Sequence, residues 1–226
     1  MGDVMIGIIV AEEKELLAVK EIMEIKEEIS IYEKIFYKGT IEDKEIVLIK
    51  ANVGKVNSAR ICQILIDKFS PRLVINVGAA GSVNNNLDIG DIVVADKLYQ
   101  YDFDVTPFGR KLGEIENIGE YIDVDNDLLK LFDDLNVVIG GIASGDKFIV
   151  DINEKNSIRE TFNVLCVEME GASIAQVCML DKVPFLIKRS ITDKLDGSSK
   201  IDFETFLESS SKKVSIVLKN ILKKLI

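Results

Sequence analysis

Apolar segments of strand length alternate with segments of helical periodicity along almost the whole chain. The first segment, Met5 to Ala11, is continuously apolar, and from Glu13 to Glu27 the apolar residues recur at helical spacing. Later segments predict strands at residues 31–37, 45–51, 73–77, 91–101, 137–143, 164–167 and 183–191. Helices are predicted at residues 57–69, 125–135, 153–162, 171–180 and 202–225, with a turn near Gly39 and loops at 78–82 and 106–123. The pattern predicts a three-layer α/β fold, in which helices flank a mixed, largely parallel central sheet, as one domain over residues 1–226.

The composition argues against several classes of protein. A formal net charge of −10 disfavours a nucleic-acid partner, because proteins that bind the phosphate backbone need a basic surface. The three cysteines are too few and too widely spaced for a disulfide framework or a zinc site. The apolar opening is too short to span a bilayer, and acidic residues follow it where a signal peptide has small ones. We therefore expect a cytoplasmic protein without a membrane partner.

Acidic residues stand where two of the apolar strands end. Glu168 and Glu170 follow the strand at 164–167, and Asp193 follows the strand at 183–191. A buried carboxylate is costly unless it is paired or functional, so these residues are the leading candidates for a site. Because the chain has no histidine, carboxylates must carry any proton transfer near neutral pH.

Other small or polar segments also follow predicted strands. They are Glu15, the segment 78–82 (GAAGS) and the segment 144–146 (SGD). Ligands of such sheets bind outside the carboxyl ends of the strands, so these segments are expected to meet at one crevice. Taken alone, the segment 78–82 is better explained as a tight turn, and Glu15 as part of a solvated first helical turn with Glu12 and Glu13.

Seven motifs in this order resemble those of the 5′-methylthioadenosine/S-adenosylhomocysteine nucleosidases, within the nucleoside phosphorylase superfamily. The motifs lie at residues 6–15, 76–81, 90–94, 104–109, 144–149, 167–170 and 191–193. The resemblance covers nearly the whole chain. It implies hydrolysis of the N-glycosidic bond of methylthioadenosine and S-adenosylhomocysteine, and of 5′-deoxyadenosine as a further expected substrate, with no metal and no organic cofactor.

The resemblance also implies roles for individual residues. Asp193 is expected to protonate adenine at N7, and Glu15 to activate the attacking water. Glu170 is expected to hold the ribose hydroxyls, with Met169 against the sugar. Phe148 and the backbone of Ile149 are expected to contact adenine, and Val105, Phe108 and Phe203 are expected to contact the 5′-thio group. The other expected substrate-binding residues are Ala79, Gly81, Glu168 and Arg189. Arg189 is also explained as a partner that balances the nearby acids.

Val105 and Phe108 are expected to reach the site of a neighbouring subunit, which implies a homodimer. The chemistry further requires a protonated Asp193, although the reference pKa of an aspartate is about 3.9. Raising this pKa by some three units corresponds to a difference of roughly 4 kcal/mol in interaction free energy between the two protonation states. Burial near Glu168 or Glu170 would raise the pKa.

Four residues depart from the pattern of the family. Glu12 stands where many relatives have methionine, Ala79 where many have serine or another small residue, and Thr192 where serine is frequent; Lys147 is unexplained. These departures leave open the preference among methylthioadenosine, S-adenosylhomocysteine, 5′-deoxyadenosine and futalosine-type nucleosides.

Two alternative functions remain at this point. A phosphorolytic relative would use phosphate as the nucleophile, but it would need clustered cations, and Glu15 would repel the phosphate. A non-catalytic nucleoside-binding or storage protein would have no need for Glu15, Glu170 and Asp193 together.

Overall fold

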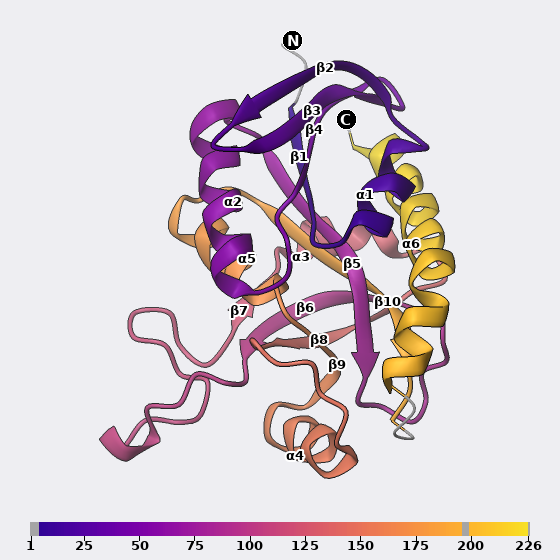
Figure 1. Ribbon diagram of the computed structural model, residues 1–226. Coiled ribbons are helices and arrows are strands. Elements are labelled where there is room, and N and C mark those ends of the chain that lie inside the picture. Colours follow the sequence, from indigo (N-terminus) through magenta and orange to yellow (C-terminus); the bar gives the residue numbers. More distant parts are fainter. Residues whose placement is uncertain (1–4, 196–198, 226) are drawn as a thin grey trace.

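The computed structural model describes residues 5–195 and 199–225, which build one ten-stranded sheet covered by helices (Figure 1). The strands are β1 (Ile6–Val10), β2 (Glu24–Ile31), β3 (Lys34–Ile41), β4 (Lys44–Lys50), β5 (Leu73–Ser82), β6 (Ile92–Gln100), β7 (Ile122–Asp123), β8 (Val138–Ser144), β9 (Val164–Glu168) and β10 (Phe185–Asp193). The helices are α1 (Glu13–Lys20), α2 (Lys55–Phe69), α3 (Asn126–Leu129), α4 (Ile152–Phe162), α5 (Gly171–Leu180) and α6 (Ser199–Lys224), with short 3₁₀ helices at Thr106–Phe108 and Lys130–Phe132. The predicted α/β class and the mixed sheet are confirmed.

The sheet is not largely parallel as predicted, because parallel and antiparallel pairings are equally frequent among the described strands. The described pairings β1–β4, β1–β5, β5–β10, β6–β8 and β8–β9 are parallel, and the other five are antiparallel. β10 pairs with both β5 and β6, and β9 joins β5 to β8, so five strands form a closed circuit of hydrogen-bonded neighbours. This circuit brings the ends of β5, β9 and β10 close together.

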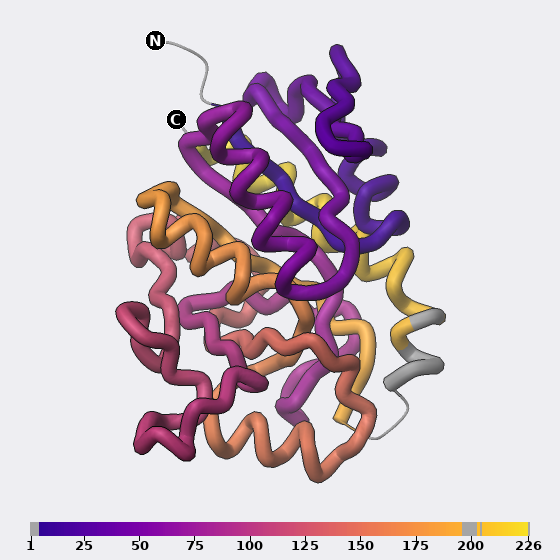
Figure 2. Tube along the Cα trace, turned by 60° about the vertical axis from the view of Figure 1, so that its left-hand side comes forward, coloured from indigo at the N-terminus to yellow at the C-terminus, as the bar shows by residue number. Residues whose placement is uncertain are grey.

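Helices cover both faces of the strands around β1 and β5. α1 packs with α6 on one side, and α2 packs with α5 on the other (Figure 1). In both views β1 begins and α6 ends at the same end of the molecule, opposite α4 (Figures 1 and 2). Most of the core is one apolar cluster between these layers, and a smaller cluster around Phe162 and Val167 lies beneath α4.

The region from residue 13 to 50 differs from the prediction. The expected helix at 13–27 ends at Lys20, and residues 24–31 form β2 instead. The expected turn near Gly39 is also wrong, because Gly39 lies inside β3, and the two turns are at Tyr32–Glu33 and Glu42–Asp43. A Cβ at Gly39 would lie 2.0 Å from the Glu24 backbone oxygen, so glycine permits the close approach of β2.

The segment 78–82 is not a loop, because β5 continues through it to Ser82. Its small residues let β10 and the start of α1 approach β5 closely. The predicted helix at 125–135 is shorter than expected, with an α-helical turn at 126–129 followed by a 3₁₀ turn. No helix within residues 5–195 and 199–225 has both the length and the apolar composition needed to cross a membrane.

Candidate active site

A cavity of about 360 Å³ lies where the ends of β1, β5, β9 and β10 meet. It brings together ten of the residues predicted for the site: Glu15, Ala79, Gly81, Phe148, Ile149, Glu168, Met169, Glu170, Asp193 and Phe203. The other lining residues are Ala11, Glu12, Val53, Ala80, Lys147 and Val167. The expectation that several strand ends converge on one crevice is therefore met, except that the segment 144–146 does not line the cavity.

Glu15 is buried in the first turn of α1 and is held by three backbone N–H groups. Its Oε2 accepts hydrogen bonds from the nitrogens of Ala11 and Glu12, both at 2.9 Å, and its Oε1 accepts one from Ala79 at 3.0 Å. Burial raises the pKa of the Glu15 carboxyl group, although these hydrogen bonds and the charge of Arg189 oppose the shift. Glu15 is thus fixed in place as a carboxyl group with increased basicity.

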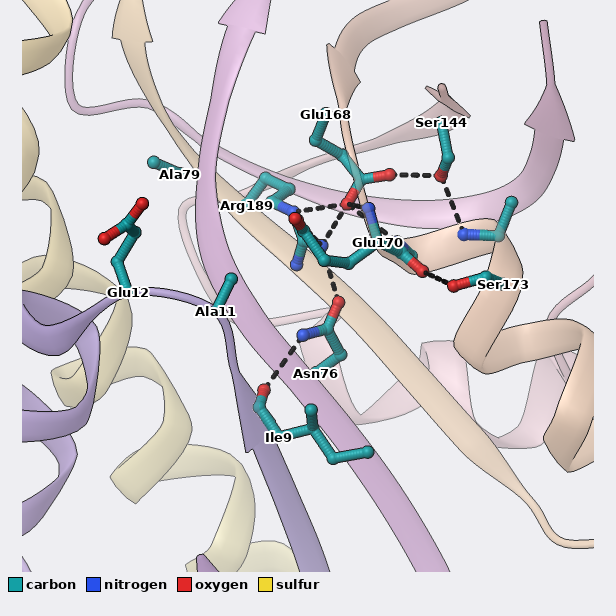
Figure 3. A network of polar contacts seen from close by, with 12 residues as sticks. Ile9, Ala11, Glu12, Asn76, Ala79, Ser144, Glu168, Glu170, Ser173 and Arg189 are labelled. Carbon is teal, nitrogen blue, oxygen red and sulfur yellow. Dashed lines mark hydrogen bonds and ion pairs between the residues drawn. The ribbon is translucent and has the colours of Figure 1, made fainter. Parts of the chain in front are cut away.

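Glu168, which lines the cavity, forms a buried ion pair with Arg189, at the centre of the network in Figure 3. Arg189 Nη2 also donates to Asn76 Oδ1 at 2.5 Å, and Asn76 Nδ2 donates to the oxygen of Ile9 at 2.9 Å. Glu168 Oε1 accepts a hydrogen bond from the Ser144 hydroxyl. The network ties β9 and β10 to β5 and β1, and it uses Arg189 to balance acids rather than to line the cavity.

Glu170 follows β9 and faces the N-terminus of α2. Its Oε1 accepts a hydrogen bond from the Gly54 nitrogen at 3.0 Å, and Arg189 Nη2 lies 3.8 Å from its Oε2. Burial, together with the negative charge of Glu168, raises the pKa of Glu170 to about 8. This carboxyl group therefore takes up and releases protons close to neutral pH.

Asp193 ends β10 and is almost completely buried. The sequence predicted Glu168 or Glu170 as its charged neighbours, whereas the structure has a cation beside it: Lys155 Nζ donates to Asp193 Oδ2 at 2.7 Å. Gly81 lies directly against the carboxyl group, because a Cβ there would be 2.8 Å from Oδ2.

Two phenylalanines form an aromatic side of the cavity. The rings of Phe148 and Phe203 meet edge to face, with centroids 5.5 Å apart. Phe148 is 41% exposed, which leaves part of its ring accessible. Val105 and Phe108 do not line the cavity of this chain; Phe108 is 85% exposed in the segment between β6 and β7.

Three of the four residues that depart from the pattern of the family line the cavity, namely Glu12, Ala79 and Lys147. The backbone nitrogens of Glu12 and Ala79 both donate to the Glu15 carboxyl group, so these two residues lie near each other (Figure 3). Lys147 forms an ion pair with Glu154 of α4. The departures from the family's pattern thus concern the site itself.

Three residues at or beside the cavity were not predicted from the sequence: Val53, Asn76 and Lys155. Asn76 lies in an apolar strand, and Lys155 precedes Ile158 and Phe162 by three and seven residues, on the buried face of α4. A polar residue on an apolar face is a signal that could have identified both. Val53 follows β4 in a loop and carries no comparable signal. Among the described residues there is no group of three or more acidic or cysteine side chains arranged to hold a metal ion.

Comparison with known proteins gives consistent matches over the whole chain. The model of the phosphorylase superfamily matches residues 5–223. A 5′-methylthioadenosine/S-adenosylhomocysteine nucleosidase of Staphylococcus carnosus is 39% identical over 228 residues, which cover 98% of this chain and 100% of the relative.

Two solved structures from Helicobacter pylori are similar to the fold. A 5′-methylthioadenosine/S-adenosylhomocysteine nucleosidase, in complex with a 4-amino-5H-pyrrolo[3,2-d]pyrimidine derivative, superimposes with a TM-score of 0.96 at 33% identity and full coverage of both chains. A futalosine hydrolase superimposes with a TM-score of 0.92 at 33% identity, and the match covers 98% of each chain.

Proposed function

The chain belongs to the phosphorylase superfamily and, within it, to the 5′-methylthioadenosine/S-adenosylhomocysteine nucleosidases, and we propose that Asp193 and Glu15 carry out its reaction. The protein is an N-glycosidic hydrolase, which releases adenine and a 5-substituted ribose. The assignment of roles rests on the arrangement of the carboxyl groups around the cavity.

The positions of Glu15 and Asp193 along β5 are the observation that carries the proposal. A Cβ at Gly78 would lie 2.9 Å from Glu15 Oε1, and one at Gly81 would lie 2.8 Å from Asp193 Oδ2. Three residues along a strand span roughly 10 Å. Both carboxyl groups line the same cavity, so an acid and a base can act on one substrate from different positions along the strand.

In the proposed mechanism Asp193 acts on the leaving group and Glu15 acts on the nucleophile. Adenine is a poor leaving group as an anion, so Asp193 protonates N7 while the bond to C1′ breaks and positive charge develops on the sugar. Glu15 takes a proton from the water that attacks C1′. Its raised pKa suits this role, since a general base is most effective when its pKa approaches the working pH.

The remaining lining residues bind the substrate in this proposal. Glu170 accepts hydrogen bonds from the ribose hydroxyls, and Met169 contacts the sugar. Phe148 stacks on adenine, while the backbone of Ile149 binds the edge of the base. Phe203 packs against the 5′-thio group.

Water is a better nucleophile than phosphate in this cavity. Five lining residues are acidic: Glu12, Glu15, Glu168, Glu170 and Asp193. Arg189, the cation below them, is already engaged by Glu168, Asn76 and the backbone oxygen of Lys188. A phosphate would meet repulsion from Glu15 without a cluster of cations to offset it.

A homodimer completes the site in this proposal, with Val105 and Phe108 of each chain lying against the 5′-thio group bound by the other. The exposure of Phe108 supports this role, because an 85% exposed aromatic ring is a natural contact for a second subunit.

The first experiment measures adenine release from methylthioadenosine, S-adenosylhomocysteine and 5′-deoxyadenosine, without phosphate and with phosphate added. We expect release without phosphate. Release only with phosphate would assign the chain to the phosphorolytic enzymes, and no release from any of the three would favour a non-catalytic binding role or a futalosine-type substrate. The relative rates then rank the substrates.

A further inference from the structure

Lys155 is a buried cation to which the mechanism above gives no role. Its Nζ donates to Asp193 Oδ2 at 2.7 Å and to the backbone oxygen of Lys194 at 2.8 Å. The side chains of Lys155 and Asp193 are 0% and 2% exposed. The ammonium group therefore holds both the carboxyl group and the backbone at the end of β10.

Packing alone does not account for a lysine at this position. The buried face of α4 otherwise presents Ile158 and Phe162 to the apolar cluster beneath the helix. A buried ion pair is often no more stable than apolar residues of similar volume. If Lys155 contributes to the action of Asp193 as an acid, this explains why a charged side chain occupies the position in α4.

We propose that Lys155 is a positioning residue for Asp193, an inference that rests on Asp193 being the acid for adenine N7. During the reaction the O–H bond of the Asp193 carboxyl group breaks and an N7–H bond forms. The electron pair of the C1′–N9 bond passes into adenine, and the oxygen of water bonds to C1′ while its proton goes to Glu15. Asp193 is left as a carboxylate, which Lys155 stabilises through a charge-assisted hydrogen bond. By binding Oδ2, Lys155 also fixes the rotation of the carboxyl group.

Two adenosine analogues can separate the influence of Lys155 on the contact between Asp193 and ring position 7 from other influences on binding. 5′-Methylthio-9-deazaadenosine has an N–H group at ring position 7, like the protonated leaving group, and requires a carboxylate acceptor. 5′-Methylthio-7-deazaadenosine has a C–H group at the same position and forms no such hydrogen bond. The sugar and the 5′ substituent are identical, and the difference at ring position 9 is the same for every variant, so a change in the ratio of the two Kd values between variants reports the contact at position 7.

The test measures both Kd values by calorimetry with the full-length protein. We expect the wild type to bind the N–H analogue more tightly, and Lys155→Met to reduce this preference by roughly tenfold or more. Arg159→Met, which removes a cation one turn further along α4, is the control and should keep the preference. An unchanged ratio in Lys155→Met, or equal weakening of both analogues, would overturn the proposal.

Asp193→Ala distinguishes failure of this inference from failure of the proposed function. If Asp193→Ala keeps the preference for the N–H analogue, Asp193 does not act at N7, and both assignments fall. If Asp193→Ala loses the preference but Lys155→Met keeps it, only the role of Lys155 is wrong. Should Lys155→Met not fold, Lys155→Gln removes the charge but keeps a hydrogen-bond donor, and the same loss of preference is expected.

Discussion

At the scale of single residues, the mechanism depends most on Asp193. Asp193→Asn keeps the size of the side chain but removes the acidic proton. We expect kcat for adenine release to fall by about 10²- to 10⁴-fold, the usual contribution of a general acid, while 5′-methylthio-7-deazaadenosine still binds. Asp127→Asn, at an exposed position in α3, serves as the control. Near-normal turnover of Asp193→Asn would show that another group protonates adenine.

Glu170 links the site to stability through its pKa. That pKa is raised to about 8, so between pH 4.5 and pH 8 the folded protein retains a proton that the unfolded chain releases. Its contribution to the free energy of unfolding therefore falls as pH rises through this window, and is constant above it. Glu170→Gln is uncharged at every pH, and its stability relative to the wild type should increase by a few kcal/mol from pH 5 to pH 8.5.

Urea unfolding at several pH values tests this expectation for Glu170. The matched control is Glu116→Gln, at an exposed position between β6 and β7. A difference between Glu170→Gln and the wild type that does not change with pH would show that Glu170 is ionised throughout the window.

At the scale of elements, the small residues at the end of β5 allow the acids to approach the strand. Gly81→Ala should displace the Asp193 carboxyl group by a few tenths of an ångström and lower kcat by about tenfold. Gly7→Ala is the control, since its Cβ would lie 2.5 Å from the Leu65 side chain, away from the cavity. We expect it to lower the melting temperature without lowering kcat. Equal kcat in both variants would mean that the acid tolerates the displacement.

At the same scale, some helices and strands could be predicted from the sequence and others could not. Helix α5 was predicted at its observed bounds because its ten-residue apolar segment, Gly171–Leu180, is longer than a buried strand usually is. β2 was missed because an edge strand with mostly exposed charged residues lacks an apolar run. The end of β5 was mistaken for a loop because small residues weaken the strand pattern where backbone and ligand approach closely.

Some residues of the candidate site could likewise be predicted from the sequence, whereas their contacts could not. Glu168, Glu170 and Asp193 could be predicted, because each stands at the end of an apolar strand. The pairing of Asp193 with Lys155 could not, since this contact joins α4 to β10 across 38 positions in the sequence. Periodicity describes local structure, whereas such a pairing is determined by how the elements pack.

At the scale of the whole molecule, the proposed homodimer gives each site residues from two chains. Phe108 of one chain would then serve the site that contains Asp193 of the other. Phe108→Ala alone should lower kcat/KM for methylthioadenosine by roughly tenfold or more, since burial of a phenylalanine contributes about 1.5–3 kcal/mol. Asp193→Asn alone should be almost inactive.

Mixed dimers of these two variants provide the decisive measurement. In a dimer of one Phe108→Ala chain and one Asp193→Asn chain, the site on the first chain has its own Asp193 and receives an intact Phe108 from the second. That site should therefore regain wild-type kcat/KM, and the other should remain inactive, so the mixed dimer should have about half the wild-type activity per dimer. Co-expression with two different affinity tags isolates the mixed species. If its activity is only the mean of the two parent dimers, Phe108 acts within its own chain or outside the site.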